Sequence, residues 1–231
     1  MFDRLSEMEW MPFVLSFKLA AITTVVLFFI ALPFAWYLSQ SRSKVKPFLE
    51  AVTALPIVLP PSVLGFYLLI LFAPNSPLGM WLDSLFGIKM AFSFSGLVAA
   101  SCIYSFPFMV QPLQSGFASL NPHMIEASYL AGKSVSATLL RVALPNIKSS
   151  LLVALIITFA HTVGEFGVVL MVGGNIPGET RVASVAIYDL VEVMDYERAD
   201  IYAGILLAFS FVVLFAVYLF QHRAKLSVGV R

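Results

Sequence analysis

Two ionisable side chains, His161 and Glu165, stand in an otherwise apolar stretch of the sequence and are its first candidates for chemistry. They are four residues apart, the spacing at which side chains of one helix meet and can hydrogen bond. An ionisable group inside an apolar helix is by default a functional candidate, and the neighbouring Gly164 would permit close approach of another helix. We therefore expect Glu165 to serve packing, an interface or a gate. The alternative is a glutamate that only reaches the lipid headgroups.

Three prolines interrupt another apolar stretch and mark a second candidate site. Pro56, Pro60 and Pro61 remove backbone donors and should break a helix there. A helix that restarts after such a break presents unpaired N–H groups, which suit an anion. Ser62 and Gly65, just beyond the break, are therefore candidates to line a path for an anion, together with Pro60 and Pro61. A kink that serves packing alone would explain the same residues.

The sequence does not favour metal or disulfide chemistry. Its three histidines, His123, His161 and His222, are spread over different segments without the spacing of metal ligands. Cys102 is the only cysteine, so neither a disulfide within the chain nor a CxxC site can form.

Segment 173–180 comes close to the pattern of a phosphate-binding loop. It departs from that pattern at Glu179, which takes the place of the phosphate-binding lysine. A carboxylate there would repel phosphate, so we expect no nucleotide site. A turn rich in glycine, proline and asparagine is a sufficient explanation.

The composition shows what must position these residues, namely apolar helices in a membrane. Of 231 residues, 60% are apolar and 12% are charged, against roughly 25% charged in a soluble domain, and the mean hydropathy is +0.92. A helix needs about 20 apolar residues to cross a bilayer, and runs of that length recur. The sequence therefore predicts an all-α polytopic membrane protein, one domain over 1–231 with five transmembrane helices. The predicted spans are about 13–39, 48–73, 92–117, 148–172 and 201–221.

Basic residues predict the orientation, because Lys and Arg accumulate in cytoplasmic loops. One set of alternate loops carries most of them, which predicts an N-terminus outside and a C-terminus in the cytoplasm. In the outer segment, 181–194 has helical apolar spacing and is expected to form an interfacial helix. The net charge of +1 gives no basic excess for nucleic acid. The cytoplasmic set comprises Arg42, Lys44, Lys46, Lys133, Arg141, Lys148, Arg223, Lys225 and Arg231.

The stretch from Asn121 to Pro145 lies between two predicted spans on the cytoplasmic side. Asn121 is a good N-cap and Pro122 is favoured at the first helical position, so a short helix should start here. Gly132 stands where that helix would end in a left-handed turn. A second short helix can follow from Ser134 until Pro145 interrupts it. The sequence therefore predicts a compact helical elbow.

This elbow is too short to cross a membrane, and it carries apolar side chains among few charges. Met124, Ile125, Tyr129 and Leu130 would leave an apolar surface that suits a protein partner. The alternative is a loop packed only against its own helices.

A few elbow residues also have a specific spacing. They are Glu126, Ala127 and Ser128, then Gly132, then Val142, Leu144 and Pro145. In this order they resemble the EAA loop of ABC importer permeases, whose pattern is EAA, three residues, Gly, nine residues and I-x-L-P. Ser128 replaces the second alanine, and Val142 replaces the isoleucine. Segments 55–69 and 164–180 resemble molybdate permeases in particular, and the resemblance covers nearly the whole chain.

The resemblance implies a specific assembly. The chain would be the permease of an ATP-driven importer in the prokaryotic cytoplasmic (inner) membrane, with the elbow as its coupling helix. It would form a homodimer, bind two cytoplasmic ABC ATPase subunits and receive its substrate from an extracytoplasmic oxyanion-binding protein. ATP hydrolysis would belong to the partner, so the chain is expected to be no enzyme and to need no cofactor. An ionised Glu165 would repel molybdate, which argues against its contact with substrate.

Other functions remain as alternatives. A permease for sulfate, thiosulfate or tungstate would use the same elbow. A stand-alone secondary transporter should show carboxylates for coupling ions and often an internal repeat, yet Glu165 is the only carboxylate away from the ends of the predicted spans, and the sequence has no repeat. A membrane-embedded enzyme is the third class, and the scattered histidines weigh against it.

Overall fold

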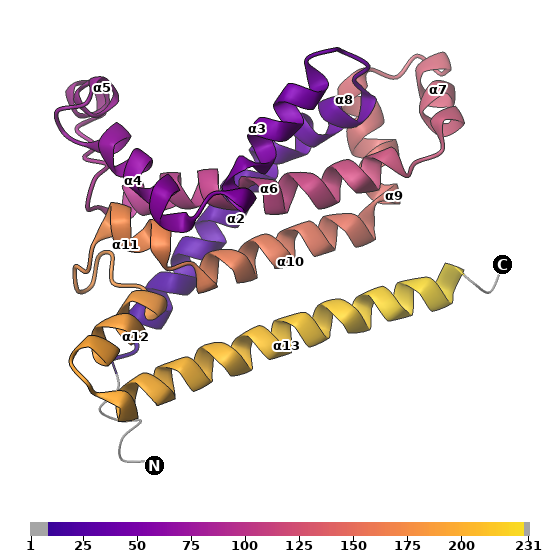
Figure 1. Ribbon diagram of the computed structural model, residues 1–231. Coiled ribbons are helices and arrows are strands. Elements are labelled where there is room, and N and C mark those ends of the chain that lie inside the picture. The colour runs from indigo at the N-terminus through magenta and orange to yellow at the C-terminus, as the bar shows by residue number, and fades with distance from the viewer. Residues whose placement is uncertain (1–8, 229–231) are drawn as a thin grey trace.

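The computed structural model describes residues 9–228, without the side chains of 220–228, and these residues form helices joined by short turns (Figure 1). Arg4 and Arg231 lie outside the described residues. In chain order the elements are α2 (Met11–Gln40), α3 (Lys46–Val58), α4 (Pro61–Phe72), α5 (Pro77–Phe86), α6 (Phe94–Ala118), α7 (Pro122–Leu130), α8 (Val135–Thr138), a π-helical turn (Leu139–Ala143), α9 (Leu144–Asn146), α10 (Lys148–Gly164), α11 (Gly167–Gly173), α12 (Ala183–Glu192) and α13 (Tyr196–Val228).

Within the described residues, three helices are long and apolar enough to cross a membrane by themselves: α2, α6 and α13. The count reaches five if each of two bent helix pairs is one span. One pair is α3 with α4, which are bent by 109°. The other pair is Val135–Asn146, which runs from α8 to α9, with α10, and these are bent by 85°. The fold class expected from the sequence is therefore confirmed, although two of the five predicted spans are not single helices.

The prolines explain the first interruption. Helix α3 ends at Val58 and α4 begins at Pro61, so Pro60 and Pro61 break the predicted span 48–73. Pro56, by contrast, lies inside α3, which continues for two more residues. The expectation that Pro56 also interrupts the helix was wrong, because the backbone bond from Leu59 N to Leu55 O closes the last turn after it.

The second interruption divides the predicted span 148–172 between α10 and α11. The chain leaves the helix at Glu165 and Phe166, whose backbone angles are not helical, and resumes it at Gly167. The glycines on either side of this dipeptide were the available signal, since glycine weakens a helix.

The core lies where α2, α6 and α10 pack together. Its buried side chains include Leu27 and Trp36 of α2, Val110 and Phe117 of α6, and Ala154 of α10. The rings of Trp36 and Phe117 meet edge to face with centroids 5.1 Å apart. This three-helix contact is the scaffold against which the broken helices are placed.

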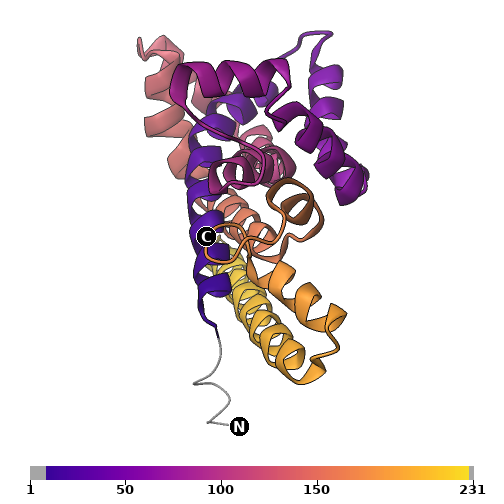
Figure 2. The ribbon, with the colours of Figure 1, turned by 90° about the vertical axis from the view of Figure 1, so that its left-hand side faces the viewer.

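Two groups of short helices occupy opposite ends of this scaffold. Figure 1 shows α7, α8 and α9 at one end and α5, α11 and α12 at the other. In Figure 2, α5 lies well away from α12 and the start of α13. We call the first group's location the elbow end. The stretch between the predicted spans 48–73 and 92–117 contains α5, which starts after the N-cap Ser76, whose side chain accepts from Gly79 N at 2.8 Å.

Helix α12 differs from the interfacial helix expected at 181–194. Its apolar residues Ala183, Val185 and Ala186 are buried by protein, so they are not left free for lipid. Ala183 N donates to Ser16 Oγ of α2 at 2.8 Å, and Phe13 and Tyr202 form one cluster with Ala183 and Ala186. Helix α12 thus joins α2 to α13.

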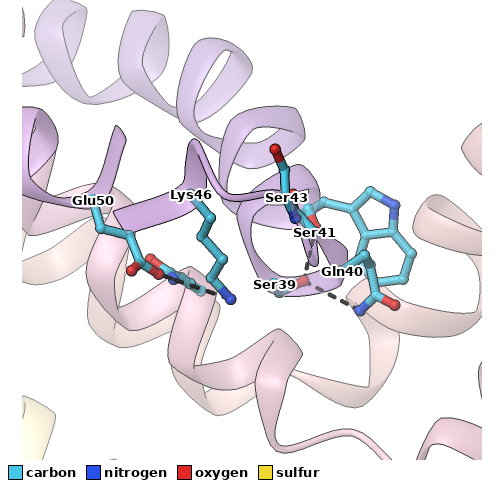
Figure 3. Close-up of polar contacts among 8 residues, drawn as sticks. Ser39, Gln40, Ser41, Ser43, Lys46 and Glu50 are labelled. Carbon is cyan, nitrogen blue, oxygen red and sulfur yellow. Dashed lines mark hydrogen bonds and ion pairs between the residues drawn. The ribbon is translucent and has the colours of Figure 1, made fainter. Parts of the chain in front are cut away.

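A polar contact fastens α3 to α6 near the elbow end (Figure 3). Gln114 Nε2 of α6 donates to Glu50 Oε1 of α3 at 2.6 Å. The Lys46 ammonium lies 3.9 Å from the same oxygen. In the preceding turn, Ser41 Oγ and Ser43 Oγ accept from backbone N–H groups two residues further on.

The close contact of α6 with α10 gives a stability prediction. A Cβ atom at Gly116 would lie 2.6 Å from Ser150 Cβ, whereas one at Gly204 on α13 would meet nothing within 4 Å. Gly116→Ala should therefore destabilise the protein by about 1–3 kcal/mol through overpacking, while Gly204→Ala should not. Thermal unfolding of the two purified variants in one detergent measures the difference. Equal midpoints would contradict the packing of α6 against α10.

Candidate functional site

The first arm of the elbow is α7, and its start follows the local sequence. Asn121 is the N-cap, and its Oδ1 accepts from His123 N at 3.0 Å, while Pro122 takes the first helical position. Glu126 lies one turn further on, with its carboxylate 3.2 Å from His123 Nδ1. Both side chains are exposed, so this contact contributes little to stability.

The end of α7 is fixed by Gly132. This residue has φ +73°, which confirms the predicted left-handed turn. Lys133 N donates to Ser128 O, and Gly132 N donates to Tyr129 O. These two bonds form a Schellman motif, the helix ending that glycine favours.

The second arm begins at the N-cap Ser134, whose Oγ accepts from Ala137 N. A single short helix was expected here, but the chain forms α8, a π-helical turn and α9 in succession. The hydroxyl oxygens of Ser128 and Thr138 are 2.8 Å apart and buried, so they tie the two arms together. Pro145 lies in α9, and the chain then turns at Ile147 into α10.

Apolar contacts hold the elbow against the end of the bundle. Ile125, Leu139, Ala143 and Ile147 are buried in the same core cluster as Phe117. Ile125 therefore faces the bundle, and the expectation that it leaves an apolar surface was wrong.

Other side chains of the elbow remain uncovered. Leu130 is 89% exposed and Val135 is 58% exposed. Val142 and Leu144 are half-buried and belong to the second arm, whereas Glu126, Ala127 and Ser128 belong to the first. The residues of the EAA pattern are therefore divided between the two arms. We use the name elbow surface for the exposed set Glu126, Ala127, Tyr129, Leu130 and Val135.

A second candidate region lies where the two broken spans meet. Gly167, at the start of α11, faces Pro61, at the start of α4; a Cβ atom on Gly167 would lie 2.7 Å from Pro61 Cβ. A Cβ atom on Gly65 would lie 2.8 Å from Met171 Cβ. Gly65 is thus a packing position between α4 and α11.

An open hollow of about 490 Å³ lies at this meeting point, and we call it the break hollow. Of the residues proposed from sequence for a pathway, Pro61, His161, Gly164 and Glu165 line it. Pro60, Ser62 and Gly65 do not, although they lie close by on α4 and its N-cap. The complete lining is Pro61, Tyr104, Ala160, His161, Gly164, Glu165, Phe166 and Gly167.

Glu165 stabilises the break in its own helix. Its side chain is turned into the protein, and the residue is 6% exposed. Oε1 accepts from Val168 N at 2.9 Å, in the first turn of α11, where N–H groups lack helical partners. Its backbone oxygen accepts from Ser184 Oγ of α12. Glu165 therefore connects α10, α11 and α12, in the manner of a packing or interface residue.

His161 hydrogen bonds across to α6. Its Nδ1 lies 3.1 Å from Ser105 Oγ, so the hydrogen bond to Glu165 that the spacing allowed is replaced by one to another helix. The ring stacks on Phe108 with centroids 3.8 Å apart and lies 4.9 Å from the Tyr104 ring. Nothing in the sequence pattern singles out Ser105 or Tyr104, because both are ordinary residues of an apolar helix.

No group of three or more His, Cys, Asp or Glu side chains in the described part of the chain could hold a metal ion. The near match to a phosphate-binding loop forms a turn closed by Thr180, whose Oγ1 donates to Gly173 O and accepts from Ile176 N. The Thr180 hydroxyl and these two backbone groups thus form hydrogen bonds within the turn.

Comparison with known proteins places the chain in a family. The family model described as "binding-protein-dependent transport system inner membrane component" matches residues 21–226. The molybdenum transport system permease protein ModB of Azotobacter vinelandii is 46% identical over 214 residues, which cover 93% of this chain and 95% of the relative. The sulfate transport system permease protein CysT of Escherichia coli is 33% identical over 189 residues, covering 82% of this chain and 68% of the relative.

Solved structures show the same fold. A bacterial ABC transporter that imports alginate is similar over 97% of this chain and 82% of that chain, with a TM-score of 0.72 at 18% identity. An amino acid ABC transporter is similar over 92% of each chain, with a TM-score of 0.61 at 18% identity. Since the family model covers nearly the whole sequence, the chain belongs to the family of binding-protein-dependent transport system inner membrane components.

Proposed function

We propose that this chain forms the membrane pathway for molybdate in an ATP-driven ABC importer. The observation that carries the proposal is the 46% identity to a molybdenum permease along almost the full length of both chains. The sulfate permeases are similar at 32–34% identity, which favours molybdate over sulfate.

The assembly follows from the family and the elbow. Two copies of the chain enclose the pathway, and two cytoplasmic ABC ATPases bind the elbow surfaces. An extracytoplasmic oxyanion-binding protein delivers the substrate at the opposite end, with the N-terminus outside, the C-terminus in the cytoplasm and the assembly in the inner membrane. The elbow is well suited to transmit force, because the bonds at Gly132 and between Ser128 and Thr138 make it stiff. The chain itself hydrolyses no ATP and needs no cofactor.

Helix α10 transmits a movement of the elbow to the break hollow. Helix α10 starts at the elbow and ends beside Glu165, whose carboxylate connects it to α11. Helix α11 packs on α4 through Gly65 and Gly167, so the two short helices shift together when α10 tilts.

The break hollow is suited to let an oxyanion pass and not to bind it tightly. Among the residues the structure describes, no Lys or Arg lines it, so a dianion finds no opposite charge there. Selectivity between oxyanions then rests mainly on the delivery protein.

The substrate assignment is tested by uptake into proteoliposomes that contain the permease, its ATPase and ATP. Addition of the loaded delivery protein should drive accumulation of molybdate, and an excess of sulfate should not suppress it. Tungstate serves as a control for an oxyanion of similar size. Accumulation of sulfate in preference to molybdate would overturn the assignment.

Gly132→Val tests the elbow as the ATPase docking site. A side chain in the left-handed conformation costs roughly 1–2 kcal/mol, so the end of α7 should distort. We expect the variant to insert and dimerise, yet to lose most of the co-purifying ATPase and its uptake. Gly178→Val is the matched control, because Gly178 has φ +76°, and a Cβ atom there also meets nothing within 4 Å, but it lies at the opposite end.

Charge changes at Glu126 should act in the same direction. Glu126 is exposed on the elbow surface, so Glu126→Lys, which reverses the charge there, should weaken ATPase recovery more than Glu126→Gln, which only removes it. Normal recovery of ATPase with Gly132→Val would exclude the elbow surface as the docking site.

Glu165 variants test the connection between α10 and α11. Glu165→Gln keeps an oxygen that can accept from Val168 N, whereas Glu165→Ala leaves the start of α11 uncapped, at a cost of about 0.5–2 kcal/mol. Glutamine should therefore retain more uptake than alanine. In the alanine variant, ATPase activity should depend less on the loaded delivery protein. Wild-type uptake and coupling in Glu165→Ala would remove this residue from the mechanism.

A further inference from the structure

Polar side chains of α6 and α10 form a chain of hydrogen bonds beside the break hollow. Thr162 Oγ1 donates to the backbone oxygen of Thr158 at 2.8 Å. The hydroxyl oxygens of Ser105 and Thr162 are 2.9 Å apart, and Ser105 Oγ lies 3.1 Å from His161 Nδ1. Ser105 and Thr162 are 1% and 2% exposed, so these groups must satisfy one another.

The direction of each bond follows from counting protons. A carbonyl oxygen can only accept, so Thr162 uses its one hydroxyl proton on Thr158. Ser105 must then be the donor to Thr162 Oγ1. Because that uses the only proton of Ser105, its contact with His161 needs the ring as donor. His161 therefore carries a proton on Nδ1, and in the neutral ring Nε2 is an acceptor.

The ring is also held in place. Phe108 stacks on it, and Tyr104 lies against it. His161 lines the break hollow while its Nδ1 is bonded to Ser105, so Nε2 is the ring nitrogen left for the hollow. A nitrogen lone pair repels the oxygens of an oxyanion, whereas an N–H group would bind them.

We infer that Ser105 is a positioning residue of the pathway, which fixes His161 as the Nδ1–H tautomer so that an oxyanion passes the break hollow without being held there. The inference rests on the proposed function in one respect, namely that the hollow belongs to the pathway. The tautomer itself is independent of any transported substrate.

The first measurement is the protonation pattern of His161 by ¹⁵N NMR of the histidine-labelled permease in lipid. The signal is assigned by its loss in His161→Gln. We expect a protonated Nδ1 and an unprotonated Nε2 in the wild type. In Ser105→Ala the ring loses its acceptor, and the proton should move wholly or partly to Nε2.

The second measurement is uptake driven by the delivery protein in proteoliposomes. In Ser105→Ala, an Nε2–H group of His161 should bind the anion in the hollow through one hydrogen bond. We therefore expect the maximal uptake rate to fall about tenfold, roughly the effect of one hydrogen bond to a charged group. The concentration of loaded delivery protein that gives half the maximal rate should not change, since docking occurs elsewhere. Ser105→Thr keeps the hydroxyl and should restore both the rate and the tautomer.

Ser101→Ala is the matched control. Ser101 lies one turn away on the same helix and is equally buried, but its hydroxyl has no hydrogen-bond partner among the residues that the structure describes. This variant should leave the rate and the NMR pattern unchanged. A proton on Nε2 in the wild type, or equal uptake rates in Ser105→Ala and Ser101→Ala, would overturn the inference. If the wild type carries no molybdate although the tautomer changes as expected in Ser105→Ala, the proposed substrate is wrong and the positioning by Ser105 stands.

Discussion

The need to satisfy backbone hydrogen bonds inside the chain is the constraint on which this structure depends. In an apolar bilayer every N–H and C=O group must find a partner within the protein. The unbroken helices α2 and α6 meet most of this demand by themselves, except where their internal prolines Pro33, Pro107 and Pro112 remove a backbone donor, and they form the scaffold. The broken spans must meet it by other means, and they do so where they contact each other. At that point Glu165 caps α11, and Gly167 lies against Pro61.

The same constraint explains why the candidate pathway residues lie where they do. A break frees polar groups and removes side chains from regular packing, so a hollow can form beside it. The hollow is lined by both breaks and by α6. Its polar groups are largely committed to holding helices together: Glu165 to α11 and α12, and His161 to α6. A lining of this kind makes the shape of the hollow depend on the relative position of the helices.

The elbow combines a turn fixed by hydrogen bonds with apolar side chains that are exposed outside the bundle. Ile125 and Leu139 anchor it in the core, and the Schellman turn at Gly132 reverses the chain in the fewest residues. Leu130 and Val135 then remain exposed. Structures that share only 18% identity with the chain have the same fold, so the fold as a whole depends on helix geometry more than on particular side chains.

The sequence by itself determined the helical membrane class, the elbow and its left-handed turn, and the break at Pro60 and Pro61. These features depend on short-range rules, namely apolar length, capping, and the conformational limits of glycine and proline. Sequence reasoning did not find the break at Glu165, the burial of Ile125, the packing of α12 or the hydrogen bond between His161 and Ser105. Only the tertiary structure decided these, because each depends on which helix lies opposite. Ser105 and His161 are 56 residues apart in the chain, and only the packing of α6 on α10 brings them together.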